Sequence, residues 1–418
     1  MVSAILSTWA LLAGVALLML GNGLQGTLLG VRASQESFDT LATGIIMTCY
    51  FAGFLLGSLF TPKVIRRVGH IRVFAAYASV ASAAVLLHSI WVTPLVWALV
   101  RLLTGVCFAG LYVISESWLN DRATNETRGA LLSAYMLVTL GSMICGQLLI
   151  NTGDTQGFDL FIFASVLVSL AVVPIALTAM PAPAFQEASS VSIRQMYQIS
   201  PLGVVGIGLQ GVANGALLSL AAVYAQQIGM TIAQTALFAS APLIGGFLMQ
   251  WPIGRMSDQL DRRKVLTATA VLGAAVALGD SMLTSESTFQ WQFIGAGLLG
   301  GVLLPQYSLC IAHTNDHLNP EQMMAGSSTL ILVSGIGLAI GPTLAAASMS
   351  VFGDFALFAT IGIMQAALAI FALFRMLARA PVPLEEQGAF VALNPRAGGI
   401  ATQAALQASL EDEELAPE

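Results

Sequence analysis

Composition separates this chain of 418 residues from soluble proteins. Only 9% of its residues are charged and 56% are hydrophobic, and the mean hydropathy is +0.81, whereas a soluble domain is roughly 25% charged. A soluble domain is therefore excluded, and we expect an integral membrane protein. The net charge of −6 says little about a substrate, because residues 379–418 alone hold two basic and seven acidic side chains.

Twelve apolar windows follow one another along the chain, each about as long as the 20 residues that a helix needs to cross a bilayer. They lack the alternating pattern of outer-membrane barrel strands, so the predicted fold class is an all-α integral membrane protein with twelve transmembrane helices. The windows are 5–30, 40–61, 72–92, 95–118, 130–151, 159–180, 201–226, 232–254, 265–284, 290–312, 325–349 and 355–377.

The distribution of Lys and Arg predicts that both termini are cytoplasmic, because basic residues are held back in short cytoplasmic loops. In this orientation every one of the 16 Lys and Arg residues is cytoplasmic except Arg32 and Arg101. The predicted location is the plasma membrane, the inner membrane of a bacterium, with multiple passes through it.

Polar residues in the first four windows are candidates for a substrate site. Asn22 and Gln25 share one face of the first helix. Arg101 lies roughly 10 Å inside the fourth window, where a charge is costly and usually faces a bundle interior or a wet cavity. It either contacts an anion or takes part in proton coupling, or it packs against backbone carbonyls of a neighbouring helix.

The stripe that begins at Arg101 continues along the fourth helix through Tyr112 to Glu116. Glu116 has two interpretations. It either titrates and couples proton movement to transport, or it pairs with Arg122 or Arg128 as a structural tie.

Polar residues also occur in the second half of the chain. Gln210 and Asn214 share a face of the seventh window, and Gln306 is followed by Tyr307 in the tenth. Each amide belongs either to a polar ring around a substrate or to an interhelical hydrogen bond. The sequence "HTNDH" at 313–317 has spacing that could suit a metal, but we interpret it as a solvated cytoplasmic loop. We therefore predict neither a metal site nor a cofactor.

The charged stretch "QWPIGRMSDQLDRRK" at 250–264 has a counterpart, "GSLFTPKVIRRVGH", at 57–70. Aligning Gly57 with Gly254 places Arg66 on Arg263, an offset of 197 residues. Two parallel repeats of six helices are therefore predicted. The expected domains are an N-terminal bundle 1–180, a cytoplasmic linker 181–200, a C-terminal bundle 201–378 and a disordered acidic cytoplasmic tail 379–418.

The stretch "GRMSDQLDRRK" resembles the loop motif Gly-x-x-x-Asp-Arg-x-Gly-Arg-Arg of the major facilitator superfamily (MFS). Four motif positions are matched, and Thr61 departs from the motif in the first-half copy, where an aspartate is expected. The matching residues are Gly254, Asp258, Arg262 and Arg263. "RLLTGVCFAG" at 101–110 resembles the fourth-helix motif of the superfamily, and "ESWLND", "QWPIGRMSD" and "GLAIGP" together resemble its bacterial YcaD-type branch.

This resemblance implies that helices one, four, seven and ten line a central cavity. The candidate substrate-binding residues are Arg101, Asn22, Gln25, Tyr112, Gln210, Asn214, Gln306 and Tyr307, with Glu116 as the candidate for proton coupling. The two charged turns are expected to act as a conformational latch that holds helices together in one state of the transport cycle. Its residues are Gly57, Arg66, Arg67, Gly254, Asp258, Arg262 and Arg263.

The resulting hypothesis is a secondary active transporter, not an enzyme, which moves a small solute by alternating access with ion, most simply proton, coupling. Neutral amides around one cation favour a small organic anion or zwitterion. A drug or metabolite efflux carrier is an alternative, and a carrier-derived membrane sensor is an alternative of another class. The expected partners are a small-molecule substrate and the lipid bilayer, with no nucleic acid, and the expected state is a monomer.

Overall fold

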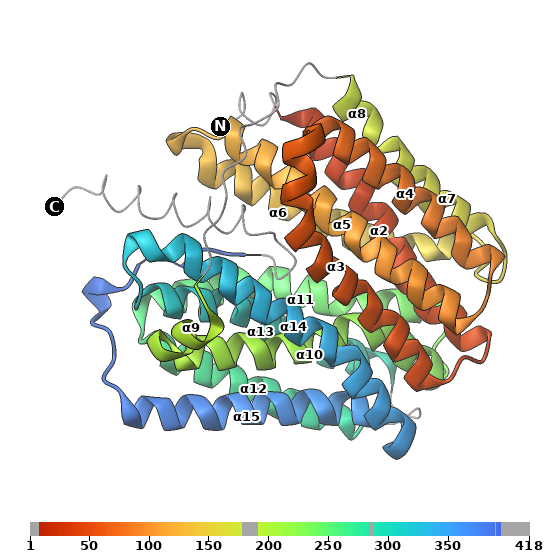
Figure 1. The fold of residues 1–418 in the computed structure, drawn as a ribbon. Helices are drawn as coiled ribbons and strands as arrows, with labels where there is room; N and C mark the ends of the chain where they lie inside the picture. The colour runs from red at the N-terminus through yellow and green to blue at the C-terminus, as the bar shows by residue number, and fades with distance from the viewer. Residues whose placement is uncertain (1–7, 178–190, 284–287, 389, 394–418) are drawn as a thin grey trace. The chain divides into compact units, whose positions relative to one another are not determined.

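The computed structural model describes residues 8–177, 191–283, 288–388 and 390–393, and these residues form helices joined by short turns (Figure 1). Within these ranges, twelve helices are long and apolar enough to span a membrane, which confirms the predicted number and order. They are α2 (Trp9–Gln35), α3 (Thr40–Val68), α4 (His70–Ile90), α5 (Pro94–Arg122), α6 (Asn125–Leu148), α7 with α8 (Asp159–Leu170 and Val172–Ala176), α10 (Pro201–Gln227), α11 (Ile232–Gln259), α12 (Arg262–Ser281), α13 (Phe289–Asn315), α14 (Pro320–Phe352) and α15 (Ala356–Ala378). The shorter helices are η1 (Leu149–Thr152), α9 (Ile193–Ile199) and η2 (Leu384–Glu386).

Several helices run further than their apolar windows. Helix α3 continues to Val68 and α11 continues to Gln259, although the windows end at 61 and 254. A helix satisfies its own backbone hydrogen bonds, so its end is set by local caps and not by the edge of the apolar stretch. Asp39 caps the start of α3 by accepting hydrogen bonds from two backbone N–H groups, and Gly69, at φ +86°, allows the turn into α4.

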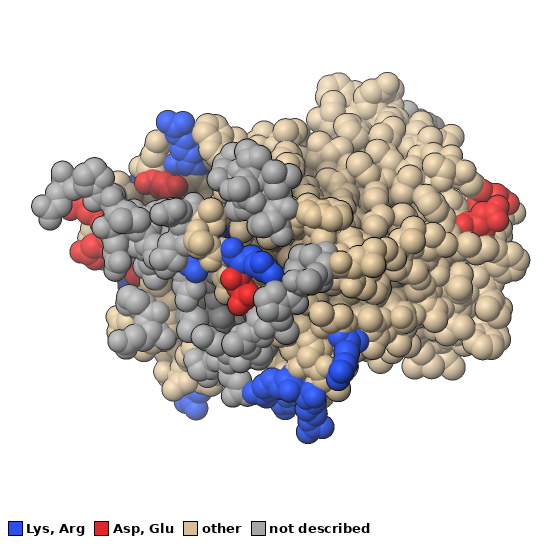
Figure 2. Space-filling model, turned by 90° about the horizontal axis from the view of Figure 1, so that it is seen from above, with Lys and Arg blue, Asp and Glu red and all other residues tan. Residues whose placement is uncertain are grey.

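Wide areas of the surface carry neither acidic nor basic side chains, and the charged residues gather in a few groups (Figure 2). Large apolar side chains are exposed among the described residues, for example Leu377 at 90% and Met282 at 80%. Contiguous apolar surface of this kind is unusual on a soluble monomer. It is the surface expected of a protein whose solvent is lipid.

The chain divides into two compact units, one formed by Met1–Glu187 with Ser219–Ser240, the other by Ala188–Leu218 with Ala241–Glu418. The division resembles the expected repeats but differs from them at 219–240, where parts of α10 and α11 group with the first unit. One contact of this segment is the hydrogen bond from Gln227 Nε2 to Thr40 Oγ1, at 2.8 Å.

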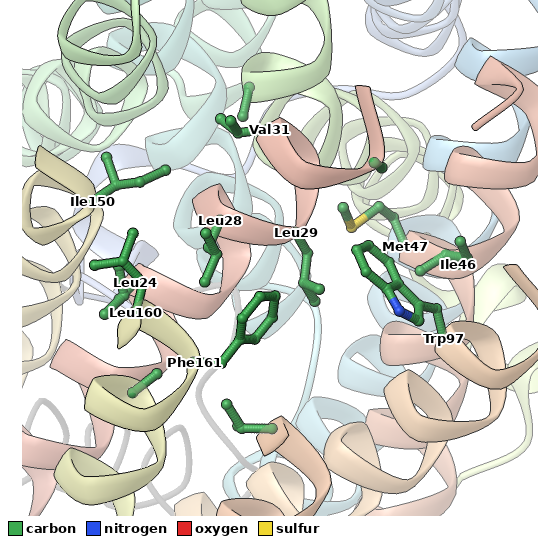
Figure 3. Packing of buried hydrophobic residues seen from close by; sticks show 14 of the residues in the cluster. Leu24, Leu28, Leu29, Val31, Ile46, Met47, Trp97, Ile150, Leu160 and Phe161 are labelled. Carbon is green, nitrogen blue, oxygen red and sulfur yellow. The ribbon is translucent and has the colours of Figure 1, made fainter. Parts of the chain in front are cut away.

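The interior of the first unit is an apolar cluster contributed by several helices (Figure 3). Leu24, Leu28 and Leu29 of α2 lie near Phe161 of α7, and Trp97 of α5 belongs to the same cluster. All five side chains are fully buried or nearly so. This cluster holds α2 and α5 together, and those two helices carry the polar candidates of the first half.

Helices α3 and α5 approach each other unusually closely because glycines lie at their contact. A Cβ atom on Gly105 of α5 would overlap the backbone of Tyr50, and one on Gly53 of α3 would overlap the backbone of Leu102. The second unit repeats the arrangement, since a Cβ on Gly300 of α13 would overlap the backbone of Pro242 on α11. The close approach of α3 and α5 brings Tyr50 beside Arg101.

Two sequence interpretations are corrected by the structure. The segment 313–317 is not a solvated loop, because α13 continues through Asn315 and His313 is only 7% exposed. Disorder was expected from 379 onward, but residues 379–388 and 390–393 lie against the second unit. Residues 394–418 lie outside the described part of the chain.

Candidate functional site

Arg101 is buried in the first unit beside an aromatic ring. Its side chain is 5% exposed, and its guanidinium carbon lies 4.1 Å from the centroid of the Tyr50 ring. The Tyr50 hydroxyl in turn donates to Asn22 Oδ1 at 3.5 Å. A cation over an aromatic face is stabilised by the ring quadrupole, more strongly when both groups are desolvated. Arg101, Tyr50 and Asn22 therefore form one connected polar group contributed by α5, α3 and α2.

Two amides of α2, Asn22 and Gln25, have buried atoms that lack a hydrogen-bond partner among the described residues. Gln25 is fully buried, and neither its Oε1 nor its Nε2 has a hydrogen-bond partner among the described residues; the same holds for Nδ2 of Asn22. A buried polar group without a partner costs about 1 to 3 kcal/mol. These atoms are therefore suited to bind a polar solute.

Glu116 lies further along α5 and is 1% exposed. Tyr135 of α6 donates a hydrogen bond from its hydroxyl to Glu116 Oε1 at 3.3 Å. From the sequence, only Arg122 and Arg128 were considered as partners of Glu116. The hydrogen bond from Tyr135 was not predicted. Tyr112, between Arg101 and Glu116, donates from its hydroxyl to Met19 Sδ at 2.9 Å.

The second unit contains its own buried amides. Gln210 Nε2 of α10 donates to the carbonyl oxygen of Leu303 at 3.1 Å. Gln306 Nε2 of α13 donates to Gln365 Oε1 of α15 at 2.8 Å. These two side chains therefore form interhelical hydrogen bonds, while Oε1 of each has no partner among the described residues.

Asn214 and Tyr307 are the remaining candidates in the second unit, and both are fully buried. Neither Oδ1 nor Nδ2 of Asn214 has a hydrogen-bond partner within the described ranges. Asn214 thus resembles Gln25 of the first unit as a buried amide whose donor and acceptor atoms have no hydrogen-bond partner among the described residues.

The turn between α11 and α12 is organised by Arg262. This side chain is 2% exposed, and its Nη1 lies 2.5 Å from Oδ1 of Asp316, whose side chain is 3% exposed. Arg262 also donates to Ser257 Oγ and to the carbonyl oxygen of Ala312, and it lies 3.5 Å from Asp258. A buried charge needs such a set of partners, and Arg262 therefore ties both ends of the turn to α13.

Arg263 makes a second set of contacts at the same turn. It donates to both carboxylate oxygens of Asp261, at 3.0 and 2.7 Å, and to the carbonyl oxygen of Arg379 at 2.7 Å. Burial by itself raises the pKa of Asp261, but the hydrogen bonds and charge of Arg263 and the charge of Lys264 outweigh it, so the pKa is lowered. Asp261 also caps the start of α12.

A small, solvent-open pocket lies beside this turn. Four arginines border it together with two aspartates and two histidines: Arg262, Arg263, Arg375, Arg379, Asp261, Asp316, His313 and His317. His317 Nδ1 donates to the carbonyl oxygen of His313 at 2.8 Å, because a carbonyl oxygen can only accept. Burial lowers the pKa of His317, and the charges of Arg379 and Arg263 lower it further, against a raising contribution from this hydrogen bond.

The corresponding turn of the first unit is built differently. Gly57 lies against α5, where a Cβ atom would come within 2.8 Å of Val106 Cα. Thr61 is fully buried, whereas Arg66 and Arg67 are exposed. At the position where the motif has an aspartate, this turn therefore has a buried threonine hydroxyl.

Three residues of these groups escaped the sequence reasoning, and a fourth, Asp316, was considered only within the possible metal spacing of 313–317. Tyr50, Tyr135, Gln365 and Asp316 each come from a helix other than that of the residue they contact. Gln365 carried a usable signal as the one amide in its window, and Asp316 carried another as an acidic residue that follows an apolar window. In the described part of the chain, no three His, Cys, Asp or Glu side chains are grouped as metal ligands would be.

Twelve membrane-spanning helices with buried polar side chains define a polytopic membrane transporter. A family model described as "Major Facilitator Superfamily" matches residues 11–214 and 203–406. The chain belongs to this superfamily, and it is accordingly a multi-pass transporter of the plasma membrane and not an enzyme.

The individual proteins to which this chain is similar are also described as transporters. The chain is 29% identical over 353 residues to the "Uncharacterized MFS-type transporter YcaD" of Escherichia coli, which covers 84% of this chain and 91% of that one. A bacterial homologue of the human lysosomal transporter Spinster, inward-facing and occupied, has a TM-score of 0.73 at 14% identity, covering 91% of this chain and 98% of that one. A D-xylose–proton symporter has a TM-score of 0.69 at 13% identity, with coverages of 92% and 100%. At these identities the two solved structures show the fold alone.

Proposed function

We propose that this transporter is a secondary active carrier that moves a small organic anion or zwitterion by alternating access. The observation that carries the proposal is the buried cation of Arg101, stacked on Tyr50 and linked through it to Asn22. An arginine presents a planar fork of donors that matches a carboxylate. The buried amides of Asn22 and Gln25 supply further donors and acceptors in the same unit.

Proton coupling is the second part of the proposal. Glu116 is a buried carboxylate in a membrane-spanning helix, with Tyr135 donating to it, and ionisable side chains at such depth commonly belong to proton relays. The D-xylose–proton symporter, by its name, couples a solute to protons on this same fold. We assign to Glu116 the proton that accompanies the substrate.

The proposed orientation has both termini in the cytoplasm, so that the α11–α12 turn is cytoplasmic and the α14–α15 turn is external. Single cysteines at the exposed positions Lys264 and Phe355, in a background without reactive native cysteines, test it with a membrane-impermeant maleimide on intact cells. We expect labelling at 355 and protection at 264. The opposite pattern would reject the orientation.

The substrate class is tested by thermal unfolding of the purified protein with metabolite anions, amino acids and cationic drugs, because a bound ligand stabilises the folded state by mass action. Hits are then assayed for counterflow in proteoliposomes, with Arg101→Ala as the binding-deficient control. Stabilisation by anions or zwitterions with counterflow supports the proposal. Stabilisation by cationic drugs alone favours the efflux carrier, and stabilisation without counterflow favours the sensor.

A further inference from the structure

The segment that follows α15 returns to the α11–α12 turn of its own unit. It leaves the helix at Arg379, whose carbonyl oxygen accepts from Arg263 and whose guanidinium donates to the carbonyl oxygen of Ile199 at 2.9 Å. After η2, residues 387, 388 and 390–393 run along the turn. We call residues 387–393 the tail segment; Ala389 within it lies outside the described residues.

The tail segment bonds to the two central charged groups of the turn. The backbone N–H of Phe390 donates to Asp258 Oδ1 at 2.8 Å. The carbonyl oxygen of Gly388 accepts from Arg262, and the N–H of Gly388 donates to Asp316 Oδ1 at 3.3 Å. Both signs of charge in the turn therefore have a backbone partner in the tail segment, and hydrogen bonds to charged groups are stronger than neutral ones.

Side-chain packing secures the same contact. The Phe390 ring lies over Gly254, where a Cβ atom would come within 2.5 Å of the ring. Leu393 is 5% exposed, its N–H donates to Ser308 Oγ at 2.9 Å, and the Ser308 hydroxyl lies 3.4 Å from the carbonyl oxygen of Leu393. The absence of a side chain at Gly254 thus makes room for an aromatic ring of the tail.

We propose that the tail segment is a built-in competitor for the α11–α12 turn: when docked, it occupies Gly254, Asp258 and Arg262 and prevents that turn from engaging a neighbouring helix. The inference rests on the proposed alternating access, in which these three residues form the latch. Docking holds the latch open, and release of the tail segment makes Asp258 and the surface of Gly254 available. The tail thereby sets the balance between the two states of the carrier.

The tail segment can compete only for the turn of the second half, because the sequence of the first-half turn differs at the position of Asp258. The first-half turn has Thr61 where the second has Asp258, so it lacks the carboxylate that accepts from a peptide N–H. The tail is also acidic at Glu385 and Glu386, and the turn is basic at Arg255 and Lys264. Opposite charges of this kind favour encounter of the two segments.

Docking is tested by amide hydrogen exchange of the full-length protein, using Phe390→Ala to remove the ring over Gly254. The matched control is Phe374→Ala, the same truncation at an outward-facing side chain of α15 that is 60% exposed. We expect the amides of residues 387, 388 and 390–393 to be protected in the parent protein and to exchange about tenfold faster in Phe390→Ala, because loss of the ring removes packing that holds their hydrogen bonds. Phe374→Ala should leave that exchange unchanged.

The regulatory role is tested by spin-label distances between positions 72 and 264, which are both exposed, both on the proposed cytoplasmic side and both outside the set of latch residues. Phe390→Ala frees the turn and should increase the population with a closed cytoplasmic side, whereas Asp258→Asn removes the latch itself and should decrease it. Exchange of the amides of residues 387, 388 and 390–393 at the rate of an unstructured peptide in the parent protein would overturn docking. Protected amides with unchanged distances in Phe390→Ala would overturn the competition. Neither readout uses a substrate, so failure of the proposed transport function would be seen separately, in the counterflow assay.

Discussion

The guanidinium carbon of Arg101 lies 4.1 Å from the centroid of the Tyr50 ring, and the hydroxyl of that tyrosine reaches Asn22. The contact exists because Gly105 and Gly53 let the backbones of α3 and α5 meet. The ring face stabilises the guanidinium charge through the ring quadrupole, and the planar fork of an arginine matches a carboxylate. We therefore propose Arg101 as the residue of this unit that binds a charged solute.

Substitutions of Arg101 and Tyr50 should distinguish the contribution of the guanidinium to substrate binding from that of the ring beside it. We expect Arg101→Ala to fold normally and to abolish uptake, and Arg101→Lys to lose most of it, because lysine lacks the planar fork. Tyr50→Leu should weaken substrate binding about fivefold to thirtyfold, the equivalent of a desolvated cation–π contact of 1 to 2 kcal/mol. Tyr50→Phe, which retains the ring, is the matched control and should bind within a few-fold of the parent. Full uptake by Arg101→Ala would assign this arginine to helix packing.

Replacement of Glu116 should uncouple transport from protons. Glu116→Gln cannot release a proton but remains close in size, so we expect it to lose uptake driven by a pH gradient while retaining substrate exchange across vesicles. Tyr135→Phe removes the 3.3 Å hydrogen bond and keeps the carboxylate, and it should preserve coupling with a changed pH dependence. Gradient-driven uptake by Glu116→Gln at the parent rate would reject the assignment.

The Arg262–Asp316 pair should be a strong determinant of stability. Both side chains are almost fully buried, and removing one partner of such a pair costs about 3 to 5 kcal/mol because the other charge is left uncompensated. We therefore expect Asp316→Ala to lower the thermal unfolding temperature markedly and Asp316→Ala with Arg262→Met to restore part of the loss. Arg255→Met, at an exposed arginine stacked 5.6 Å from the Trp251 ring, is the control and should change stability little. Equal effects of Arg255→Met and Asp316→Ala would contradict this account.

His317 should make the cytoplasmic end of the second unit sensitive to acid. Its pKa in the folded protein is lowered from 6.5 by burial and by Arg379 and Arg263, so the unfolded chain takes up the proton first. The stability that neutral His317 contributes is fully present above pH 6.5, declines as the pH falls below that value, and is lost below the folded pKa.

Thermal unfolding of the parent protein and of His317→Gln between pH 7.5 and 5 measures this contribution. Other groups also titrate in that range, so the informative quantity is the difference between the two proteins. We expect the parent to lose more stability than the variant as the pH falls. Parallel curves would show that His317 contributes no pH dependence.

The twelve spans, their order and the internal repeat were determined by the sequence alone. Insertion into a bilayer depends on the summed polarity of about 20 consecutive residues, which is a local property that any window reveals. The buried position of Arg101 followed in the same way, from its distance along the helix. The offset between Gly57 and Gly254 likewise required only comparison of one stretch with another.

Only the tertiary structure showed Tyr50 under Arg101, Tyr135 beside Glu116, and Asp316 and Gly388 on Arg262. Each of these pairs joins different elements, and whether they meet depends on how far each helix is rotated about its own axis and how closely the axes approach. In lipid no difference in hydrophobicity between helix faces fixes that rotation, because it is set by small residues and interhelical contacts. The docking of an apparently disordered tail on the α11–α12 turn was hidden for the same reason, since the groups that hold it become neighbours only after α11, α12 and α13 have packed.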